Sequence, residues 1–347
     1  MKERRLSWIL SIAMVCLIFA GSGSWSVPSA GAETINLTYA NFPPAPTFPC
    51  VQMERWVKEV QKRTKGKVKI KTFPGSTLLG AKNMFDGVVK GVADIGCLAT
   101  AYQPGRFKLF QAIDLPVGFP NGAVASATMW DLYVKYKPAS FKGTKVLTTF
   151  TCATANIMSQ VPVRKLEDLK GLKLRAAGTG VKVMNLLGAA ATGMPMSAVP
   201  EALQKGVVKG LVSSLEVMKD LKFAEYCKFA TICDLWVVPF AVVMNQKKWD
   251  ALPADVKKVM EDLSKEQAIW TGKYVDTHAQ DAVKWAKKTQ GVEFITLSKD
   301  EMAKWMGKLH GLKAEYVKAM DKAKLPGKAF LGDLMKFKEK YTKELAK

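Results

Sequence analysis

Strand-like and helix-like segments alternate at the start of this chain, and this alternation is the feature that most restricts its fold. Thr34–Ala40 has the period of a half-buried strand, and Val68–Phe73 is a second strand. Between them, Phe48–Thr64 places apolar residues at near-helical spacing. Ala81–Lys90 predicts another helix, which leads through Gly91–Gly96 into a third strand. This order is typical of a parallel, doubly wound sheet.

The later part of the chain predicts more strands and one long helix. Lys145–Phe150 is strand-like and follows a predicted helix at Ala123–Tyr136. Phe223–Asp234 and Trp236–Asn245 are apolar enough for further strands. A helical region follows from Pro253 to about residue 289, and the proline is acceptable in its first turn. The length is sufficient for two lobes or for one large α/β unit.

One arginine stands where a ligand-binding charge is expected. In the stretch Leu166–Ser214, Leu172–Leu174 and Val207–Val212 have strand composition. Arg175 follows the first of these strands and precedes the small-residue loop Ala176–Gly180. Open α/β sheets bind ligands at the carboxyl ends of their strands, and arginine can hold a carboxylate with two parallel hydrogen bonds. Arg175 therefore predicts a site for a small acid, and a surface charge that ends a strand is the alternative.

Residues 1–32 have the order of a secretory signal peptide. Met1–Arg5 is basic, Leu6–Ala20 is apolar, and Ala30–Ala32 is a small-x-small cleavage site. The apolar core is too short for a convincing membrane span. Cys16 lies inside this core after Val15, which disfavours a lipoprotein. We therefore expect a soluble, exported protein with a periplasmic location.

The net charge of +22 raises the possibility of a nucleic-acid or envelope partner. The lysines are spread along predicted helices and alternate with acids, as in Lys336–Lys347. Such a spread is typical of a solvated face rather than a phosphate-binding track. The pattern therefore predicts no nucleic-acid partner, and a basic envelope-binding or nucleic-acid-binding protein is a lower alternative.

Five cysteines follow the signal peptide, and an exported compartment permits disulfides. The odd number leaves at least one thiol unpaired. Cys97 and Cys152 lie in apolar, strand-like surroundings and are expected as small core residues. Cys227 and Cys233 are candidates for a disulfide, and their spacing is not that of a metal site.

Signals for catalysis are weak. The only histidines, His278 and His310, lie in helical, lysine-rich segments. The sequence has no nucleophile elbow, phosphate-binding loop or metal-ligand spacing. We therefore expect no catalytic residue, no metal and no cofactor. An exported carboxylate-processing enzyme is a second low alternative.

Four segments resemble, in the same order, motifs of the solute-binding proteins of TRAP (tripartite ATP-independent periplasmic) transporters. They are FPGSTLLGAKNMFDGVVKGVADIG, LEDLKGLKLR, VPEALQKGVVKG and NQKKWDALPADVKKVM, and the match covers nearly the whole mature chain. The resemblance implies a two-lobed α/β periplasmic-binding-protein fold, with mixed sheets flanked by helices and a long helix crossing both lobes. It also implies a non-enzymatic receptor that closes like a hinged trap over a small organic acid and delivers it to the permease subunits of a TRAP transporter.

The resemblance also implies a division of the chain. Residues 33–152 are expected to form lobe I, and residues 153–240 are expected to form lobe II. Residues 241–280 return to lobe I and include the start of the long connecting helix. Residues 281–347 add to lobe II and carry the C-terminal helices. Hinge crossings are expected near Cys152 and Phe240, where strand material changes lobes.

Arg175 aligns with the family arginine that binds the substrate carboxylate, so the resemblance implies this role for it. Further ligand contacts are expected at strand ends and in loops that face the cleft. Each has an alternative role, which is backbone hydrogen bonding for the polar residues and core packing for the aromatic ones. The candidates are Asn156, Ser213, Trp236, Phe240, Tyr102 and Phe42.

This chain departs from the family pattern at three positions. Ala155–Asn156 stands where sialic-acid-type members carry a second arginine. Lys209 replaces an acidic residue, and Ser213–Ser214 replaces an asparagine that often follows. We therefore do not expect sialic-acid-type specificity and favour a small monocarboxylate with an apolar or aromatic body. A receptor for an aromatic or otherwise apolar monocarboxylate that feeds a sensor rather than a permease is the alternative.

Overall fold

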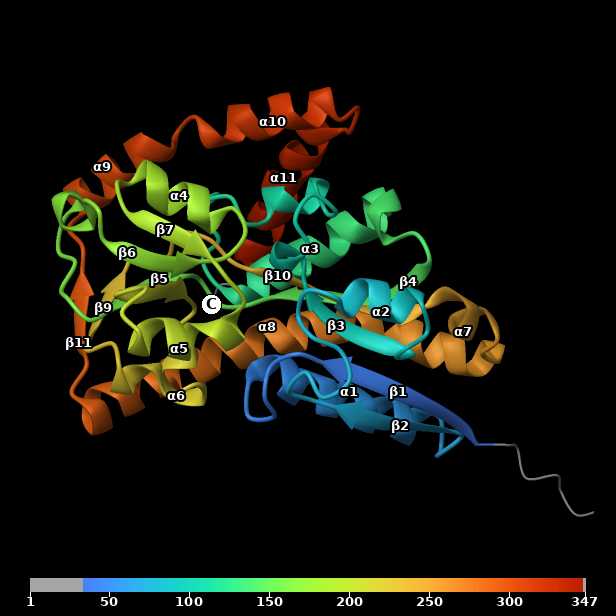
Figure 1. The fold of residues 1–347 in the computed structure, drawn as a ribbon. Helices are drawn as coiled ribbons and strands as arrows, with labels where there is room; N and C mark the ends of the chain where they lie inside the picture. The colour runs from blue at the N-terminus through green and yellow to red at the C-terminus, as the bar shows by residue number, and fades with distance from the viewer. Residues whose placement is uncertain (1–33, 346–347) are drawn as a thin grey trace, which may run out of the picture. The chain divides into compact units, whose positions relative to one another are not determined.

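The strands of this chain form two sheets with helices packed around them (Figure 1). The computed structural model describes residues 34–345. The predicted signal peptide, residues 1–32, lies outside these described residues. The predicted α/β class, with mixed sheets flanked by helices, is confirmed.

The first sheet has five strands in the order β2-β1-β3-β10-β4. β1 pairs in parallel with β2 and β3, as the alternation of strands and helices predicts. β10 pairs antiparallel with β3 and β4, so the sheet is mixed. The strands are β1 (Ile35–Asn41), β2 (Val68–Phe73), β3 (Ile95–Ala99), β4 (Thr144–Thr151) and β10 (Pro239–Asn245). The helices α1 (Phe48–Arg63), α2 (Met84–Val89) and α3 (Gly122–Tyr136) connect the first four strands, and α7 (Gln246–Asp250) follows β10.

The second sheet has six strands in the order β11-β9-β5-β8-β6-β7. β6 is parallel to β7 and β8, whereas β5 is antiparallel to β8 and β9. The strands are β5 (Asn156–Ser159), β6 (Lys173–Ala176), β7 (Ala190–Gly193), β8 (Gly210–Ser213), β9 (Phe229–Ile232) and β11 (Glu293–Thr296), and the helices between them are α4 (Gly180–Leu186), α5 (Val199–Gln204) and α6 (Val217–Asp220).

The second sheet differs from the sequence prediction at two places. Phe223–Asp234, which its apolar composition predicts as strand, is a strand only over Phe229–Ile232, and Phe223–Glu225 is a 3-10 turn. β7 has no sequence signal, because Ala190–Gly193 contains only alanine, threonine and glycine and lies largely exposed at the sheet edge. Strand prediction depends on burying apolar side chains, and this strand buries few.

Two chain segments run side by side between the sheets. Residues 152–155 lead from β4 into β5, and residues 233–238 lead from β9 into β10. The predicted hinge crossings fall within or next to these segments. Three backbone hydrogen bonds join the segments directly: Cys152 N to Val238 O (3.1 Å), Ala155 N to Trp236 O (2.7 Å) and Leu235 N to Ala155 O (3.1 Å).

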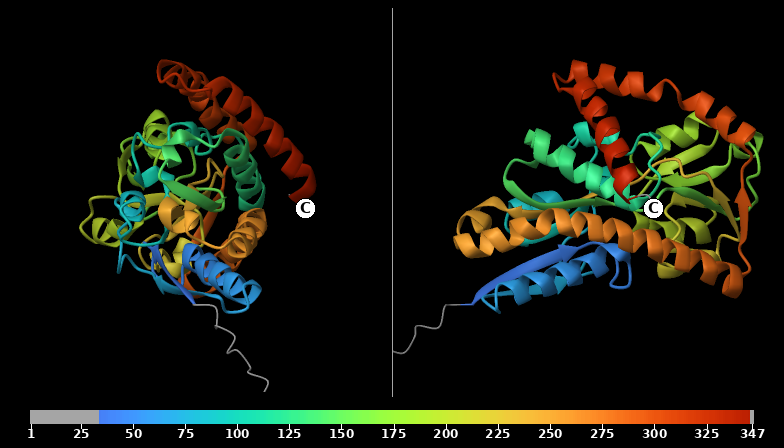
Figure 2. Two further views of the ribbon diagram at one scale, coloured as in Figure 1. Left: turned by 90° about the vertical axis from the view of Figure 1, so that its right-hand side faces the viewer. Right: turned by 180° about the vertical axis from the view of Figure 1, so that it is seen from behind.

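A third connection is α8 (Ala254–Gln290), a helix of 37 residues. It contacts α1, α3 and β4 of the first sheet's layer and α6 beside the second sheet, and Figure 2 shows it running along both. It ends at Gly291, whose φ of 63° is the left-handed conformation that glycine adopts easily after a helix. No helix among residues 34–345 is both long enough and apolar enough to cross a membrane.

The C-terminal helices contact elements of both sheets' layers. They are α9 (Lys299–Leu309), α10 (Leu312–Lys322) and α11 (Gly327–Leu345). α9 contacts α4, whereas α11 contacts α3 and the 3-10 turn Leu109–Ala112 (Figure 2). Residues 281–347, for which the sequence predicts a contribution to lobe II and the C-terminal helices, thus contact the layers of both sheets.

The five cysteines of the described chain are all buried and all free. Cys97 and Cys152 lie in the apolar core, as their surroundings predict. The candidate disulfide between Cys227 and Cys233 is not formed. Burial raises the pKa of the Cys152 and Cys227 thiols to about 12, so both are protonated at neutral pH.

Candidate functional site

Arg175 is buried between the two sheets' loop regions. It occupies the next-to-last position of β6 and is 1% exposed. Its Nε donates a hydrogen bond to the Met194 carbonyl (2.9 Å), and its Nη2 donates to the Tyr102 hydroxyl (2.8 Å). The same hydroxyl accepts from the Met196 amide (3.2 Å). Tyr102, from the loop after β3, thus joins the first sheet's side to the second.

The positive charge of Arg175 has no acidic partner among residues 34–345. A guanidinium carries five N–H donors, and the hydrogen bonds above use only two N–H groups. Burying a charge is costly unless an opposite charge and hydrogen bonds compensate it. The side chain is therefore able to bind an anion that the protein itself does not supply.

A cavity of about 60 Å³ lies beside this guanidinium. Its apolar wall includes Phe42 and Phe240, whose rings are parallel at a centroid distance of 6.3 Å. Tyr102 adds an edge-on ring 5.6 Å from Phe42. These aromatic rings lower the polarity around the guanidinium, and low local polarity strengthens any ion pair formed with Arg175.

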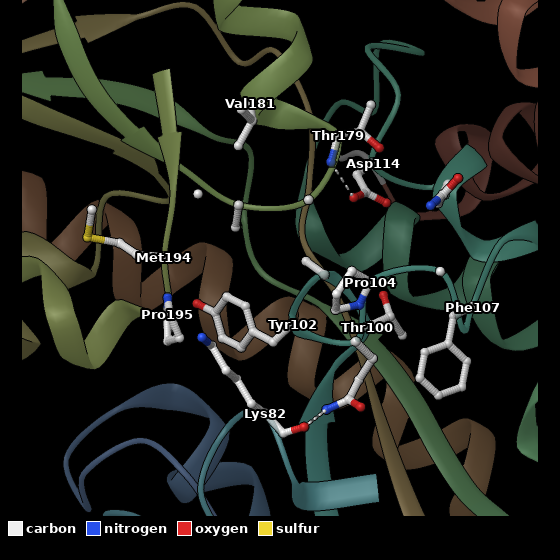
Figure 3. Close-up of a pocket in the computed structure, with 17 residues that line it drawn as sticks. Lys82, Thr100, Tyr102, Pro104, Phe107, Asp114, Thr179, Val181, Met194 and Pro195 are labelled. Carbon is white, nitrogen blue, oxygen red and sulfur yellow. Dashed lines mark hydrogen bonds between the residues drawn. The ribbon is translucent and has the colours of Figure 1, made fainter. Parts of the chain in front are cut away.

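Tyr102 also lines a second, larger cavity of about 430 Å³ (Figure 3). This cavity is formed by the loop after β3 and by the turns around residues 177–181 and 193–195. In Figure 3 the Tyr102 hydroxyl points toward Met194 and Pro195, and Asp114 faces Thr179. Tyr102 therefore belongs to the walls of both cavities.

Five of the seven predicted contact residues line the cavity beside Arg175. They come from loops and strand ends of both sheets, as the sequence predicts for a cleft between lobes. They are Phe42, Tyr102, Arg175, Ser213 and Phe240.

Asn156 does not line this cavity, and its amide is fully engaged elsewhere. Its Oδ1 accepts hydrogen bonds from the backbone amides of Cys233 and Asp234 (2.7 and 3.0 Å). Its Nδ2 donates to the Thr154 carbonyl and to the Asp234 carboxylate (3.1 and 3.0 Å). The side chain therefore satisfies backbone groups where the chain leaves β9, which is the alternative that the sequence left open.

Trp236 is a core residue that lines neither cavity. It is 2% exposed, and its ring lies against Gly180 at the start of α4. A Cβ at Gly180 would come within 2.3 Å of the indole ring, so only glycine fits there. Core packing, the commoner role of such an aromatic, explains this tryptophan.

Two acidic residues of the cavity wall were missed by sequence reasoning. Glu216 and Asp220 lie on α6 and the turn before it, and they line the same cavity as Arg175. The only signal in the sequence was that Glu216 follows shortly after Ser213, the end of a predicted strand, in an otherwise apolar segment. By contrast, the side chain of Lys209 is exposed and absent from the cavity wall, so the departure from the family pattern there does not alter this cavity.

Asp114 makes a pH-sensitive contact with the start of α4. Its carboxylate accepts a hydrogen bond from the Thr179 amide (3.2 Å), and burial raises its pKa to about 7. An unfolded aspartate ionises near pH 4. The folded state therefore binds more protons between about pH 4 and 7, and stability falls as pH rises through this window.

We expect Asp114→Asn to remove this loss, because an amide oxygen still accepts the Thr179 N–H but cannot ionise. When the pH rises from 5 to 8, the unfolding free energy of the wild type should fall by about 2 kcal/mol more than that of the variant. Urea unfolding at both pH values measures this. Asp86→Asn, at an exposed aspartate paired with Arg106, should follow the wild type, and parallel pH profiles for all three proteins would contradict the prediction.

Comparison with known proteins decides the family. The family model DctP, bacterial extracellular solute-binding protein family 7, matches residues 43–319. The chain belongs to this family. Family 7 consists of binding proteins, so the receptor function that the sequence predicts is confirmed, as is the periplasmic location.

Individual relatives of family 7 agree with this assignment. A TRAP periplasmic solute-binding protein of Desulfovibrio salexigens is 53% identical, with a TM-score of 0.80 over 88% of this chain and 96% of that one. A marine metagenome TRAP solute-binding protein specific for aromatic acid ligands, in complex with 3-hydroxybenzoate, is 29% identical, with a TM-score of 0.83 over 89% and 99%. The 2,3-diketo-L-gulonate-binding periplasmic protein of Escherichia coli (strain K12) is 27% identical over 81% of this chain and 86% of its own length.

Proposed function

We propose that this family 7 receptor binds the carboxylate of a small organic acid with Arg175, delivers the acid to a TRAP permease and catalyses no reaction. The observation that carries the proposal is the buried guanidinium without an acidic partner beside a cavity. A ligand carboxylate supplies the missing charge and accepts the unused N–H groups. Two relatives named above take carboxylic acids, diketogulonate and 3-hydroxybenzoate, which supports this ligand class.

The walls of the cavity favour a ligand with an apolar or aromatic body. The aromatic rings of Phe42 and Phe240 line the cavity, and Tyr102 lines both this cavity and the larger one next to it. Ser213 adds a hydroxyl at the end of β8. We assign these four residues, with Arg175, to the ligand site, and leave Asn156 and Trp236 outside it.

We further propose that binding closes the two lobes about the segments 152–155 and 233–238. The predicted division, with lobe I at residues 33–152 and 241–280 and lobe II at residues 153–240 and 281–347, is consistent with strand crossings at these places. The contact of Tyr102 with Arg175 would then form part of the closed state. Closing requires that the ligand bind the closed state more tightly than the open one. The radius of gyration measured by small-angle scattering should decrease on addition of the true ligand, and an unchanged scattering curve would count against this hinge.

A thermal-shift screen against small carboxylates tests the receptor function. One or a few acids should raise the melting temperature saturably, because a ligand that binds only the native state stabilises it by about 2.7 kcal/mol at 100 times its Kd. Chromatography of the incubated acid should recover it unchanged. Turnover of the acid would support the alternative of a carboxylate-processing enzyme. Salt-sensitive retention on nucleic acid, without any response to acids, would support the alternative of a nucleic-acid-binding protein.

A further inference from the structure

Glu216 is a buried carboxylate with one unused oxygen in the wall of the ligand cavity. It is 1% exposed and lines the same cavity as Arg175, yet the two side chains form no ion pair. Its Oε1 accepts a hydrogen bond from the Ser214 hydroxyl (2.6 Å). Its Oε2 is buried and has no partner among the described residues. A buried acceptor without a donor is unusual and costs about 1–3 kcal/mol.

No side chain among residues 34–345 forms an ion pair with Glu216, although it lies near the His278–Asp220 pair. Asp220, which lines the same cavity, pairs through Oδ1 with His278 Nε2 (2.8 Å), and its Oδ2 also lacks a partner. The hydrogen bond to Asp220 raises the pKa of His278, so that pair is internally compensated. Burial raises the pKa of Glu216 to about 7, and its hydrogen bond with Ser214 only partly offsets this. Among the described residues, the cavity wall therefore carries one donor-rich group, Arg175, and two carboxylate oxygens without a partner, Glu216 Oε2 and Asp220 Oδ2, of which only Glu216 has no ion-pair partner on its other oxygen.

We propose that Glu216 is a specificity-determining residue whose Oε2 accepts a hydrogen bond from the ligand, so that the receptor selects acids that also carry an O–H or N–H donor. This inference rests on the proposed function, in which Arg175 binds the carboxylate. Such a ligand pairs with Arg175 and with Glu216 at once, whereas an acid without a donor leaves Oε2 unpaired. A site built to hydrogen-bond a substrate group discriminates strongly against the analogue that lacks it.

The test uses three matched series of three acids. In each series the first acid has no donor besides its carboxyl group, the second carries a hydroxyl group and the third an ammonium group. They are propionate, lactate and alanine; succinate, malate and aspartate; and 3-phenylpropionate, 3-phenyllactate and phenylalanine. Calorimetric titration of the wild type identifies the series that binds most tightly. Within it, we expect the hydroxyl or the ammonium acid to bind at least about tenfold more tightly than the acid without a donor. Whichever of these two acids binds more tightly identifies the donor, hydroxyl or ammonium, that the site prefers.

Glu216→Gln separates this role from a structural one. The amide keeps an acceptor for Ser214 but places an N–H₂ group where Oε2 was. The advantage of the donor-bearing acid should fall to about threefold or less, while the affinity for the acid without a donor stays within about threefold of the wild type. Glu201→Gln, at an exposed glutamate paired with Lys205, should leave the discrimination unchanged.

The outcomes distinguish this inference from the proposed function. Equal affinity of the wild type for donor-bearing and donor-free acids overturns the role of Glu216 and leaves carboxylate binding intact. Retained discrimination in a folded Glu216→Gln variant overturns it as well. Binding of no acid in any series counts against the proposed function, and this inference falls with it. The comparison within the wild type needs no variant, so it decides the question even if Glu216→Gln does not fold.

Discussion

Arg175→Met is expected to weaken binding of the carboxylate ligand at least tenfold, while the protein remains folded. Methionine fills much of the volume of the arginine side chain but offers neither charge nor donors. The ligand carboxylate would then be buried without a partner, and breaking a buried ion pair in this way costs about 3–5 kcal/mol. Calorimetric titration with the acid found in the thermal-shift screen measures the loss.

The same variant should behave differently in the absence of ligand. Arg175 is buried without an acidic partner in the described chain, so its removal takes away an unfavourable charge as well as two hydrogen bonds. We expect the unfolding free energy of ligand-free Arg175→Met to lie within about 1 kcal/mol of the wild type or above it. Arg106→Met, at a more exposed arginine paired with Asp86, should keep full affinity. Unchanged affinity in Arg175→Met would remove this residue from the site.

The position of Arg175 at a strand end beside a cavity could be predicted from the sequence. A charged residue at the end of an apolar strand, followed by small residues, is visible without knowledge of the fold. The parallel strands β1–β3 and the long helix α8 were visible for a similar reason, because each buries apolar side chains at a regular period. Local patterns of this kind carry their own structural meaning.

The rest of the site depends on contacts between segments far apart in the chain. Asn156 and Trp236 resemble pocket residues in sequence, but one satisfies backbone amides near residue 233 and the other packs on Gly180. Glu216 shows the reverse case, since only the fold brings it together with Cys152 and Phe240 in one cavity wall. Composition does not distinguish a buried acid from a surface one.

The crossing of α8 over α3 supports the segment that leads from β4 to the second sheet, and Gly272 is the residue that permits this crossing. A Cβ at Gly272 would lie 2.5 Å from the Cα of Ala123 and 2.6 Å from the carbonyl oxygen of Gly122. These are backbone atoms at the start of α3, so they cannot move aside as a side chain does. One turn further along α8, the Asp276 carboxylate accepts hydrogen bonds from the Gly122 and Ala123 amides (2.7 and 2.9 Å).

Gly272→Ala is therefore expected to lower the unfolding free energy by about 3 kcal/mol, even though alanine favours a helix over glycine. Overpacking costs about 1–3 kcal/mol, and displacement of α8 also lengthens the two Asp276 hydrogen bonds to α3. Gly307→Ala is the matched control, because Gly307 lies in α9 with nothing within 4 Å of its added Cβ. There the substitution should raise stability by about 0.5–1 kcal/mol. Urea unfolding measures both changes, and equal midpoints for Gly272→Ala and the wild type would show that the α8–α3 crossing is looser than this geometry requires. Since Gly122 also accepts a hydrogen bond from Thr151 at the end of β4 (3.4 Å), a displaced α8 should disturb the crossing segment and weaken ligand binding as well.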